Sequence, residues 1–281
     1  MNDAGRPEAS PLGKSTSYCD RYAPELLFPV PRAEKRAELG IVATGAGLPF
    51  FGEDLWNAYE VSWLNPRGKP VVALAEFRVP AESPCLIESK SFKLYLNSFN
   101  QERINDAAAL TALLQRDLSA AAGAEVQVSL SPLSARPDRQ IAALPGALLD
   151  DIDIAIDCYS PDASLLAARF SGPVVEETLH SHLLKSNCLV TGQPDWGAVV
   201  VRYRGPQIDR AALLRYIVSF RQHNEFHEQC VERIFCDIST QCRPERLEVW
   251  ARYARRGGLD INPWRSSHAS SPPPNLAELR Q

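Results

Sequence analysis

The feature of this sequence that most restricts its fold is an internal repeat. The pattern Y-x-x-S-F-x-Q occurs at residues 95–101 and again at residues 216–222, a constant offset of 121. Each copy follows strand-like segments and begins a helical pattern. Four identities in a seven-residue window can also arise by chance, but the economical interpretation is one supersecondary unit that is present twice. We therefore expect two copies of one strand–strand–helix module in a single chain.

The elements around the first copy follow from local patterns. Two strand-like runs, 56–64 and 70–79, are separated by a turn of the Asn-Pro-x-Gly type, which is typical of a hairpin. Apolar residues at helical spacing predict one or two helices over 91–120, with an interruption near Asn105. A further short strand is expected at 124–130.

The second half repeats this order. The alternation of Asp and Ile over residues 151–159 predicts a strand with the isoleucines on one face. A strand at 198–204 leads to Asp209, which is suited to cap a helix. A long amphipathic helical region then extends to about Ile238, and a further strand is predicted at 246–254.

These patterns give an α+β chain with a division into four segments. A length of 281 residues favours about two domains. We expect a loosely ordered lead-in at 1–20, an N-terminal module at 21–150 and a C-terminal module at 151–265. The tail at 266–281 contains three consecutive prolines and is expected to be partly disordered.

Charge and hydropathy exclude some classes of protein. Thirty basic residues against 34 acidic ones give a net charge of −4, which argues against a protein that coats nucleic acid. No run approaches the ~18 apolar residues of a transmembrane helix, and the first residues lack the pattern of a secretory signal. We expect a cytoplasmic protein whose seven cysteines are free thiols.

The densest candidate site is the segment 181–197. Cys188 precedes a loop broken by glycine and proline, and a thiolate is a strong nucleophile whose pKa Lys185 could help to lower. Asp195 lies across the loop and could donate a proton if burial beside Trp196 raised its pKa. The alternative is a buried core thiol and an aspartate that caps a turn.

Two further segments suit an anionic ligand. Glu88 and Ser89 lie at a helix start, where they are ordinary capping residues, but the same helix start with Lys90 could bind a phosphate. Paired arginines precede paired glycines at 255–258, and such glycines allow close approach of the backbone to a phosphate. The alternative for this second segment is a solvated turn.

The remaining candidate is the helical segment near residue 227. His223, His227 and Cys230 have a spacing that partly fits zinc. A competing interpretation uses Glu228 as a two-oxygen acceptor for adjacent N–H donors of a ligand, with Phe226 as a stacking face. The alternative to both is a solvated helix face.

Taken together, these segments resemble the long-form 7-cyano-7-deazaguanine reductases, the NADPH-dependent nitrile reductases of tRNA queuosine biosynthesis. The resemblance extends from Leu12 to Arg265 and is carried by four motifs in order, at 88–101, 188–197, 226–233 and 255–265. It implies the tunnelling fold, in which antiparallel sheets with two helices on one face associate into barrels. Long forms carry two such modules in tandem, and we expect a homodimer.

The resemblance also implies roles for single residues. Cys188 would form a covalent thioimide with the nitrile carbon, and Asp195 would donate the proton. The residues implied to contact substrate, together with the stacking face proposed above, are Ile87, Glu88, Ser89, Phe226, His227 and Glu228. Those implied to contact NADPH are Ser89, Lys90, Arg256 and Gly257. No metal, nucleic acid or membrane partner is expected.

Two alternatives to the nitrile reductase remain at this point. One is a zinc-dependent pterin or GTP cyclohydrolase-type enzyme of the same fold, which would use His223, His227 and Cys230. The other is a non-catalytic purine- or pterin-binding module, which would keep Glu228 and Phe226 and need no nucleophile.

Overall fold

The computed structural model describes residues 9–11, 18–42, 47–135 and 140–281. Most of the expected lead-in at 1–20 therefore lies outside the described residues, as does Leu12, where the family resemblance begins.

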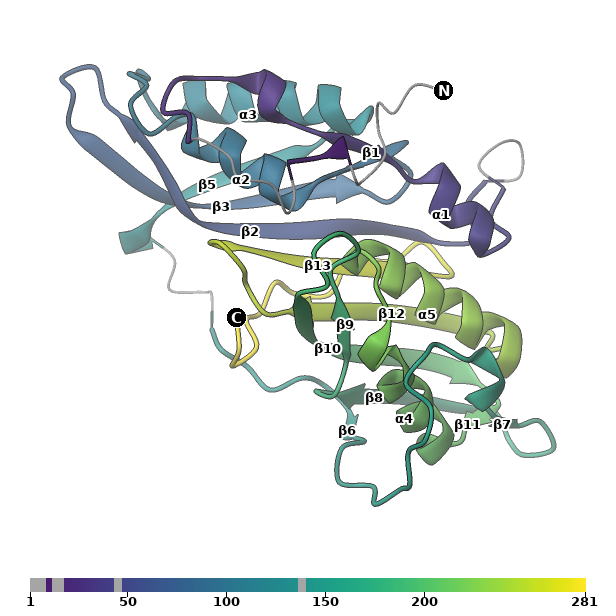
Figure 1. The fold of residues 1–281 in the computed structure, drawn as a ribbon. Helices are drawn as coiled ribbons and strands as arrows, with labels where there is room; N and C mark the ends of the chain where they lie inside the picture. Colours follow the sequence, from purple (N-terminus) through teal and green to yellow (C-terminus); the bar gives the residue numbers. More distant parts are fainter. Residues whose placement is uncertain (1–8, 12–17, 43–46, 136–139) are drawn as a thin grey trace.

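One twisted sheet runs through both halves of the chain (Figure 1). The first half supplies three strands, β2 (Phe51–Leu64), β3 (Pro70–Pro80) and β5 (Gln127–Pro132). The second half supplies β6 (Ala147–Leu148), β8 (Val175–Ser181), β9 (Lys185–Asn187), β10 (Pro194–Gly205), β12 (Arg246–Tyr253) and β13 (Leu259–Ser266). Their order is β5-β3-β2-β13-β12-β10-β8-β6, with β9 paired to β10, and every pair except β6–β8 is antiparallel.

Four longer helices follow the predicted module order. They are α2 (Ser89–Asn97), α3 (Ala107–Ala122), α4 (Arg210–Ser219) and α5 (His227–Cys242), and the short α1 (Ala33–Glu38) precedes β2. Carboxylate side chains cap three of them, because Glu88, Asp106 and Asp209 accept hydrogen bonds from the first free backbone N–H groups. The predicted interruption near Asn105 and the predicted cap at Asp209 are thus confirmed.

Two small sheets complete the elements. The strand β1 (Pro29–Pro31) pairs with β4 (Cys85–Ile87), and β7 (Ala168–Arg169) pairs with β11 (Gln207–Ile208). Because β4 leads directly into α2, the first of these sheets fixes the start of that helix.

The internal repeat that the sequence shows is also present in the structure. In both copies the tyrosine and phenylalanine rings meet edge to face, with centroids 5.2 Å apart in 95–101 and 5.4 Å apart in 216–222. In both, the serine Oγ donates to the tyrosine carbonyl oxygen at 2.6 Å. The tyrosine hydroxyl donates to Asp117 of α3 in the first copy and to Asp237 of α5 in the second. The prediction of two tandem α+β modules is confirmed.

The seam between the modules is the pairing of β2 with β13, which runs from Leu259↔Ala58 to Ser266↔Phe51. Alternation along β13 puts Ile261 and Arg265 on one face. Ile261 packs into the core under α2 and α3, whereas Arg265 contacts Glu232 of α5. Both helix pairs therefore cover the same face of the sheet, as predicted.

Two expectations about the second half are wrong. Residues 151–159 form no strand: Ile152 and Ile154 pack against the C-terminal core while the aspartates face outward, but the segment has no ladder partner among the described residues. The long helical region is also broken, because α4 ends at Ser219 and α5 begins only at His227.

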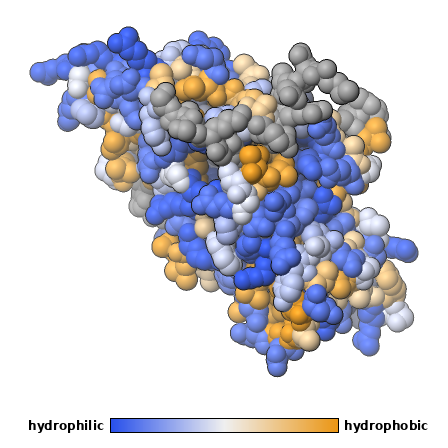
Figure 2. Space-filling view, viewed as in Figure 1, coloured by the Kyte–Doolittle hydropathy of each residue, from blue (hydrophilic) through white to orange (hydrophobic). Residues whose placement is uncertain are grey.

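The C-terminal tail, for which we expected partial disorder, lies across the sheet face opposite the helices. Arg252 Nη2 donates to the carbonyl oxygen of Pro274 at 2.6 Å, and Gln281 Nε2 donates to that of Tyr253 at 3.0 Å. On the face shown in Figure 2, hydrophobic residues form separate groups among hydrophilic ones. None of the described helices is both long and apolar enough to cross a membrane.

Candidate functional site

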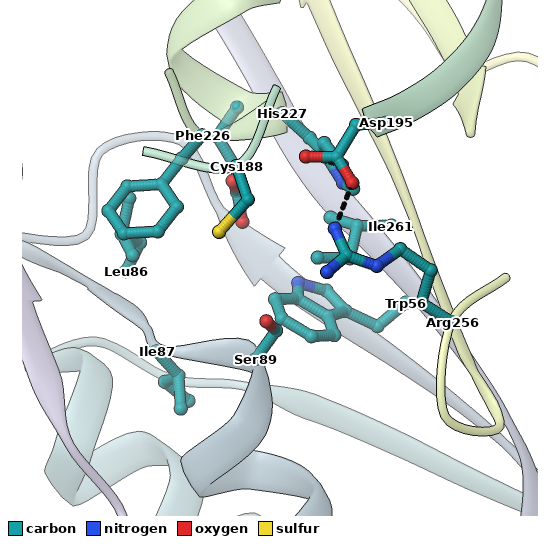
Figure 3. A pocket seen from close by; sticks show the side chains of 11 residues that line it. Trp56, Leu86, Ile87, Ser89, Cys188, Asp195, Phe226, His227, Arg256 and Ile261 are labelled. Carbon is teal, nitrogen blue, oxygen red and sulfur yellow. Dashed lines mark hydrogen bonds and ion pairs between the residues drawn. The ribbon is translucent and has the colours of Figure 1, made fainter. Parts of the chain in front are cut away.

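A cavity lies above the seam between the modules, where α2 and α5 begin (Figure 3). The space between its walls is about 390 Å³ including the open mouth. Both halves line it, through Trp56, Leu86, Ile87, Ser89, Cys188, Asp195, Phe226, His227, Glu228, Arg256 and Ile261. The structure thus brings together predicted site residues from all four motifs.

Cys188 is held at the cavity by the loop between β9 and β10. Its N–H donates to the carbonyl oxygen of Gln193 at 2.8 Å, and its own carbonyl accepts from the N–H of Gly192 at 3.0 Å. Gly192 has φ +66°, which favours glycine. The side chain is 6% exposed, and Figure 3 shows its sulfur pointing between Phe226 and Trp56.

The hydrogen bonds of Lys185, which was expected to help this thiol, go to other groups. Lys185 Nζ instead donates to Asn187 Oδ1 at 2.5 Å and to the carbonyl oxygen of Arg221 at 2.7 Å. The ammonium group is therefore bonded to the hairpin and to the neighbouring helix end.

Asp195, at the start of β10, is a buried carboxylate between the side chains of His227 and Arg256. Arg256 Nη1 bonds to its Oδ1, and His227 Nε2 lies 3.4 Å from its Oδ2. Burial alone would raise the pKa of Asp195, but His227 and Arg256 outweigh it and hold that pKa below its usual value. The expectation that Trp196 buries the carboxyl and raises its pKa is wrong, since Trp196 is 44% exposed.

His227 is fixed in orientation at the first residue of α5. Its ring stacks on that of Tyr253, with centroids 3.8 Å apart and planes 9° apart. Its Nδ1 is buried and has no hydrogen-bond partner within the described part of the chain. Because Nε2 faces Asp195, the two side chains form one unit at the cavity wall.

Glu228 is a buried carboxylate that lines the cavity. It is 2% exposed, and no other described residue donates a hydrogen bond to its side chain. Burial and the charge of Asp54 raise its pKa to about 7. Apart from the N–H of its own backbone, the carboxylate has acceptor capacity for a ligand that carries N–H donors.

Glu88 caps α2, as the capping alternative expected. Its two oxygens accept from the N–H groups of Lys90 and Ser91 at 2.7 and 2.8 Å, so that it caps α2. The cavity wall is formed by its neighbours Ile87 and Ser89. The capping alternative therefore describes its observed contacts.

A second hollow opens beside the cavity and shares Ser89, His227, Arg256 and Ile261 with it. Its volume is about 1220 Å³ including the mouth, and its cationic side chains are Lys90, Lys93 and Arg256. Gly257 and Gly258 have φ of +59° and +82° and form the tight turn between β12 and β13.

The zinc alternative has no support in the geometry. His223 lies outside α5 and its Nε2 bonds to Glu225 Oε2 at 3.0 Å. Cys230 is fully buried, and burial raises its pKa well above the usual value. Among the described residues, no three His, Cys, Asp or Glu side chains come together as metal ligands.

Three residues of the cavity wall were not predicted, namely Trp56, Leu86 and Ile261. Each belongs to a strand in which apolar residues are common, so no local signal separates a residue of the wall from one of the core. Only the pairing of β2 with β13 brings Trp56 and Ile261 opposite one another.

The fold and the cavity define a two-module tunnelling-fold protein with a thiol and a carboxylate at one site. Comparison with known families supports this class. Residues 18–130 match the family described as "Nitrile reductase, 7-cyano-7-deazaguanine-reductase N-term", and residues 194–272 match the family described as "QueF-like protein".

Similar proteins extend over the whole chain. A protein of Azoarcus sp. (strain BH72) is 65% identical over 285 residues, with 100% of each chain covered. One of Dechloromonas aromatica is 66% identical, covering 97% of this chain and 95% of its own. One of Chromobacterium violaceum is 59% identical, covering 99% of each. All three are named NADPH-dependent 7-cyano-7-deazaguanine reductase.

The chain belongs to the family of NADPH-dependent 7-cyano-7-deazaguanine reductases. The family resemblance predicted from the four motifs is confirmed, as are the predicted class of enzyme, an oxidoreductase, and the predicted cofactor, NADPH.

Proposed function

We propose that this protein reduces the nitrile of 7-cyano-7-deazaguanine to the aminomethyl group of 7-aminomethyl-7-deazaguanine, within tRNA queuosine biosynthesis. The observation that carries the proposal is that Cys188, Asp195 and Glu228 line one small cavity. This combination provides a nucleophile, a proton-transfer group and a group that recognises a base.

Cys188 opens the reaction as a nucleophile. Its sulfur adds to the nitrile carbon, the carbon–nitrogen triple bond becomes a double bond, and nitrogen takes up a proton. The product is a covalent thioimide, whose C=N group accepts hydride more readily than a nitrile does. Incubation with the nitrile in the absence of NADPH tests this step, because the mass of the intact protein should increase by the mass of one substrate molecule.

Asp195 delivers the proton. In this proposal the proton comes from His227 Nε2, which lies 3.4 Å from Asp195 Oδ2, and it passes through Asp195 to the nitrogen as negative charge develops there. Stacking on Tyr253 keeps His227 in place during the transfer.

Two molecules of NADPH supply one hydride each when bound, so that one nitrile, two NADPH and two protons give one amine and two NADP⁺. The second hollow fits such a cofactor, because Lys90 and Arg256 can meet phosphates and the Gly257 turn allows close approach of the backbone. After the first reduction, the carbon–sulfur bond breaks, Cys188 leaves as a thiolate and an imine remains for the second reduction.

Recognition of the base is the proposed role of Glu228. A deazaguanine base presents a ring N–H and an exocyclic amino group side by side, which match two carboxylate oxygens. Phe226, Ile87 and Ser89 would contact the ring system from the cavity wall. Because the carboxylate of Glu88 already accepts from the N–H groups of Lys90 and Ser91, it would contact the base only through its remaining lone pairs.

The variant Glu228→Gln should weaken substrate binding, because one acceptor oxygen becomes a donor that faces the donors of the base. Loss of one charged hydrogen bond is worth about 1.5–3 kcal/mol, which is roughly a 10- to 150-fold weaker affinity. Calorimetric titration with the nitrile measures it. The control Glu245→Gln alters a surface carboxylate that pairs with Arg204 and should bind as the parent does. Unchanged binding by Glu228→Gln would exclude Glu228 from recognition.

The variants Arg256→Ala and Lys90→Ala should each raise the Michaelis constant for NADPH, by about 10-fold or more, because a charged contact to phosphate is lost. The parent enzyme should strongly prefer NADPH to NADH, since the 2′-phosphate adds close to two negative charges. The matched control is Arg255→Ala: Arg255 lies over the ring of Tyr59 and does not line the hollow. Steady-state kinetics with both nucleotides decide the matter, and equal use of the two would refute the assignment.

We further propose that the protein acts as a homodimer in the cytoplasm, without a nucleic acid or membrane partner. The open sheet supports a dimer, since β5 and β6 lie at its two ends and a tunnelling-fold barrel needs further strands to close. The net charge of −4 supports the absence of a nucleic acid partner.

A further inference from the structure

A cluster of buried charges lies where the N-terminal segment, β2, β13 and α5 meet. Its five members are at most 4% exposed, namely Arg32, Arg36, Asp54, Glu232 and Arg265. Three guanidinium groups face two carboxylates, which leaves one positive charge unbalanced. Because an unbalanced charge is costly to bury, a further anionic group is expected at the edge of this cluster.

Most of these charges are tightly paired. Arg265 Nη2 lies 2.8 Å from both Asp54 Oδ1 and Glu232 Oε1. Arg36 donates to the same glutamate through Nε at 2.9 Å and through Nη2 at 2.7 Å. The glutamate therefore neutralises parts of two guanidinium groups and has little capacity left for a third.

Arg32 is the member whose pairing is incomplete. Its Nη2 donates to Asp54 Oδ2 at 2.5 Å and its Nε to Ser83 Oγ at 3.2 Å. Its Nη1 is buried and has no hydrogen-bond partner in the described part of the chain; Glu232 Oε1 lies 3.8 Å away. Glu228 precedes Glu232 by one turn of α5, on the same face of the helix.

We propose that Arg32 is a positioning residue that keeps the carboxylate of Glu228 charged and directed toward the substrate. Glu228 then supplies the negative charge that the cluster lacks, although Arg32 does not line the cavity. This inference rests on the proposed function, in which Glu228 recognises the base. Arg32 acts on binding only through Glu228.

The groups around Glu228 set the direction of the expected pH dependence. Burial and Asp54 raise the pKa of Glu228 to about 7, whereas His227 and Arg32 lower it. The other charged groups on neighbouring elements are paired among themselves: Glu232, Arg36 and Arg265 in the cluster, and Asp195 with Arg256 across the cavity. A protonated Glu228 loses acceptor capacity, so substrate affinity should fall as the pH decreases through about 7.

Calorimetric titration of the full-length protein with 7-cyano-7-deazaguanine across this pH range tests the inference. Cys188→Ala serves as the parent background for all variants, because it removes covalent addition to the nitrile from the measured affinity. Arg32→Gln should move the fall in affinity to higher pH by about one unit, the usual effect of losing a close opposite charge. Asp54→Asn should move it to lower pH, because a repelling charge is removed. Arg32→Lys should restore the parent profile. The control Arg36→Gln changes the same cluster and should leave the profile in place.

Shifts of opposite sign cannot come from general loss of structure. Unshifted profiles in Arg32→Gln and Asp54→Asn, or shifts in the same direction, would overturn the inference. If Arg32→Gln does not fold, Arg32→Met is the second variant and should move the fall in affinity in the same direction, to higher pH. Failure of the parent protein to bind the nitrile at any pH would overturn the proposed function instead.

Discussion

Replacement of Cys188 by alanine should abolish both nitrile reduction and the covalent adduct that forms without NADPH. The physical reason is that a thiolate at the cavity adds to the nitrile carbon, and Cys188 is the one cysteine among the described residues that lines it. The side chain is small and the loop is held by backbone hydrogen bonds of Cys188, so the fold should persist. Mass measurement of the intact protein and NADPH consumption give the two readouts.

The matched control for this experiment is Cys158→Ser. Cys158 is a partly exposed thiol whose Sγ donates to the carbonyl oxygen of Ser160, away from the cavity. This variant should form the adduct and turn over as the parent does. An adduct that persists in Cys188→Ala would show that another nucleophile reacts.

Replacement of Asp195 by asparagine should keep most of the substrate affinity and lose most of the turnover. A positioned acid–base group contributes about 10² to 10⁴ in rate, and an amide cannot carry the proton that Asp195 shares with His227. The buried carboxylate also balances Arg256, so some stability should be lost with it. Single-turnover kinetics separate the loss of rate from a change in binding.

A control on the same strand is Arg202→Gln. Arg202 lies on β10 with its guanidinium 5.2 Å from the ring of Trp250, outside the cavity. It should leave turnover near that of the parent. If Asp195→Asn also turned over at the parental rate, Asp195 would only cap a turn and balance Arg256.

Local patterns in the sequence predict the parts of the fold that depend on contacts between residues close together in the chain. Asp209 caps α4 because a carboxylate satisfies free N–H groups wherever a helix begins. The repeat at 95–101 and 216–222 is likewise reproduced in side-chain contacts, since each contact joins neighbouring turns. The alternation over 151–159 correctly reports one packed side, yet alternation does not specify a hydrogen-bonded partner.

The parts that could not be predicted depend on contacts between distant residues. The pairing of Leu259 with Ala58 joins residues far apart in the chain, and neither residue carries a local mark of it. The same holds for the guanidinium of Arg32, which meets α5 only in the folded protein. The predicted rise in the pKa of Asp195 was wrong for a related reason, because His227 and Arg256, which lower this pKa, reach it from other elements.

The β2–β13 seam has a consequence for the way this protein loses its activity. The cavity exists only while both halves remain joined, because Trp56 and Cys188 come from opposite sides of that seam. Melting of either half therefore removes the binding site for the nitrile together with the surroundings that make the thiol useful. We therefore expect activity to be lost in the same cooperative transition as the folded structure. A chain with one melted half should have no residual activity.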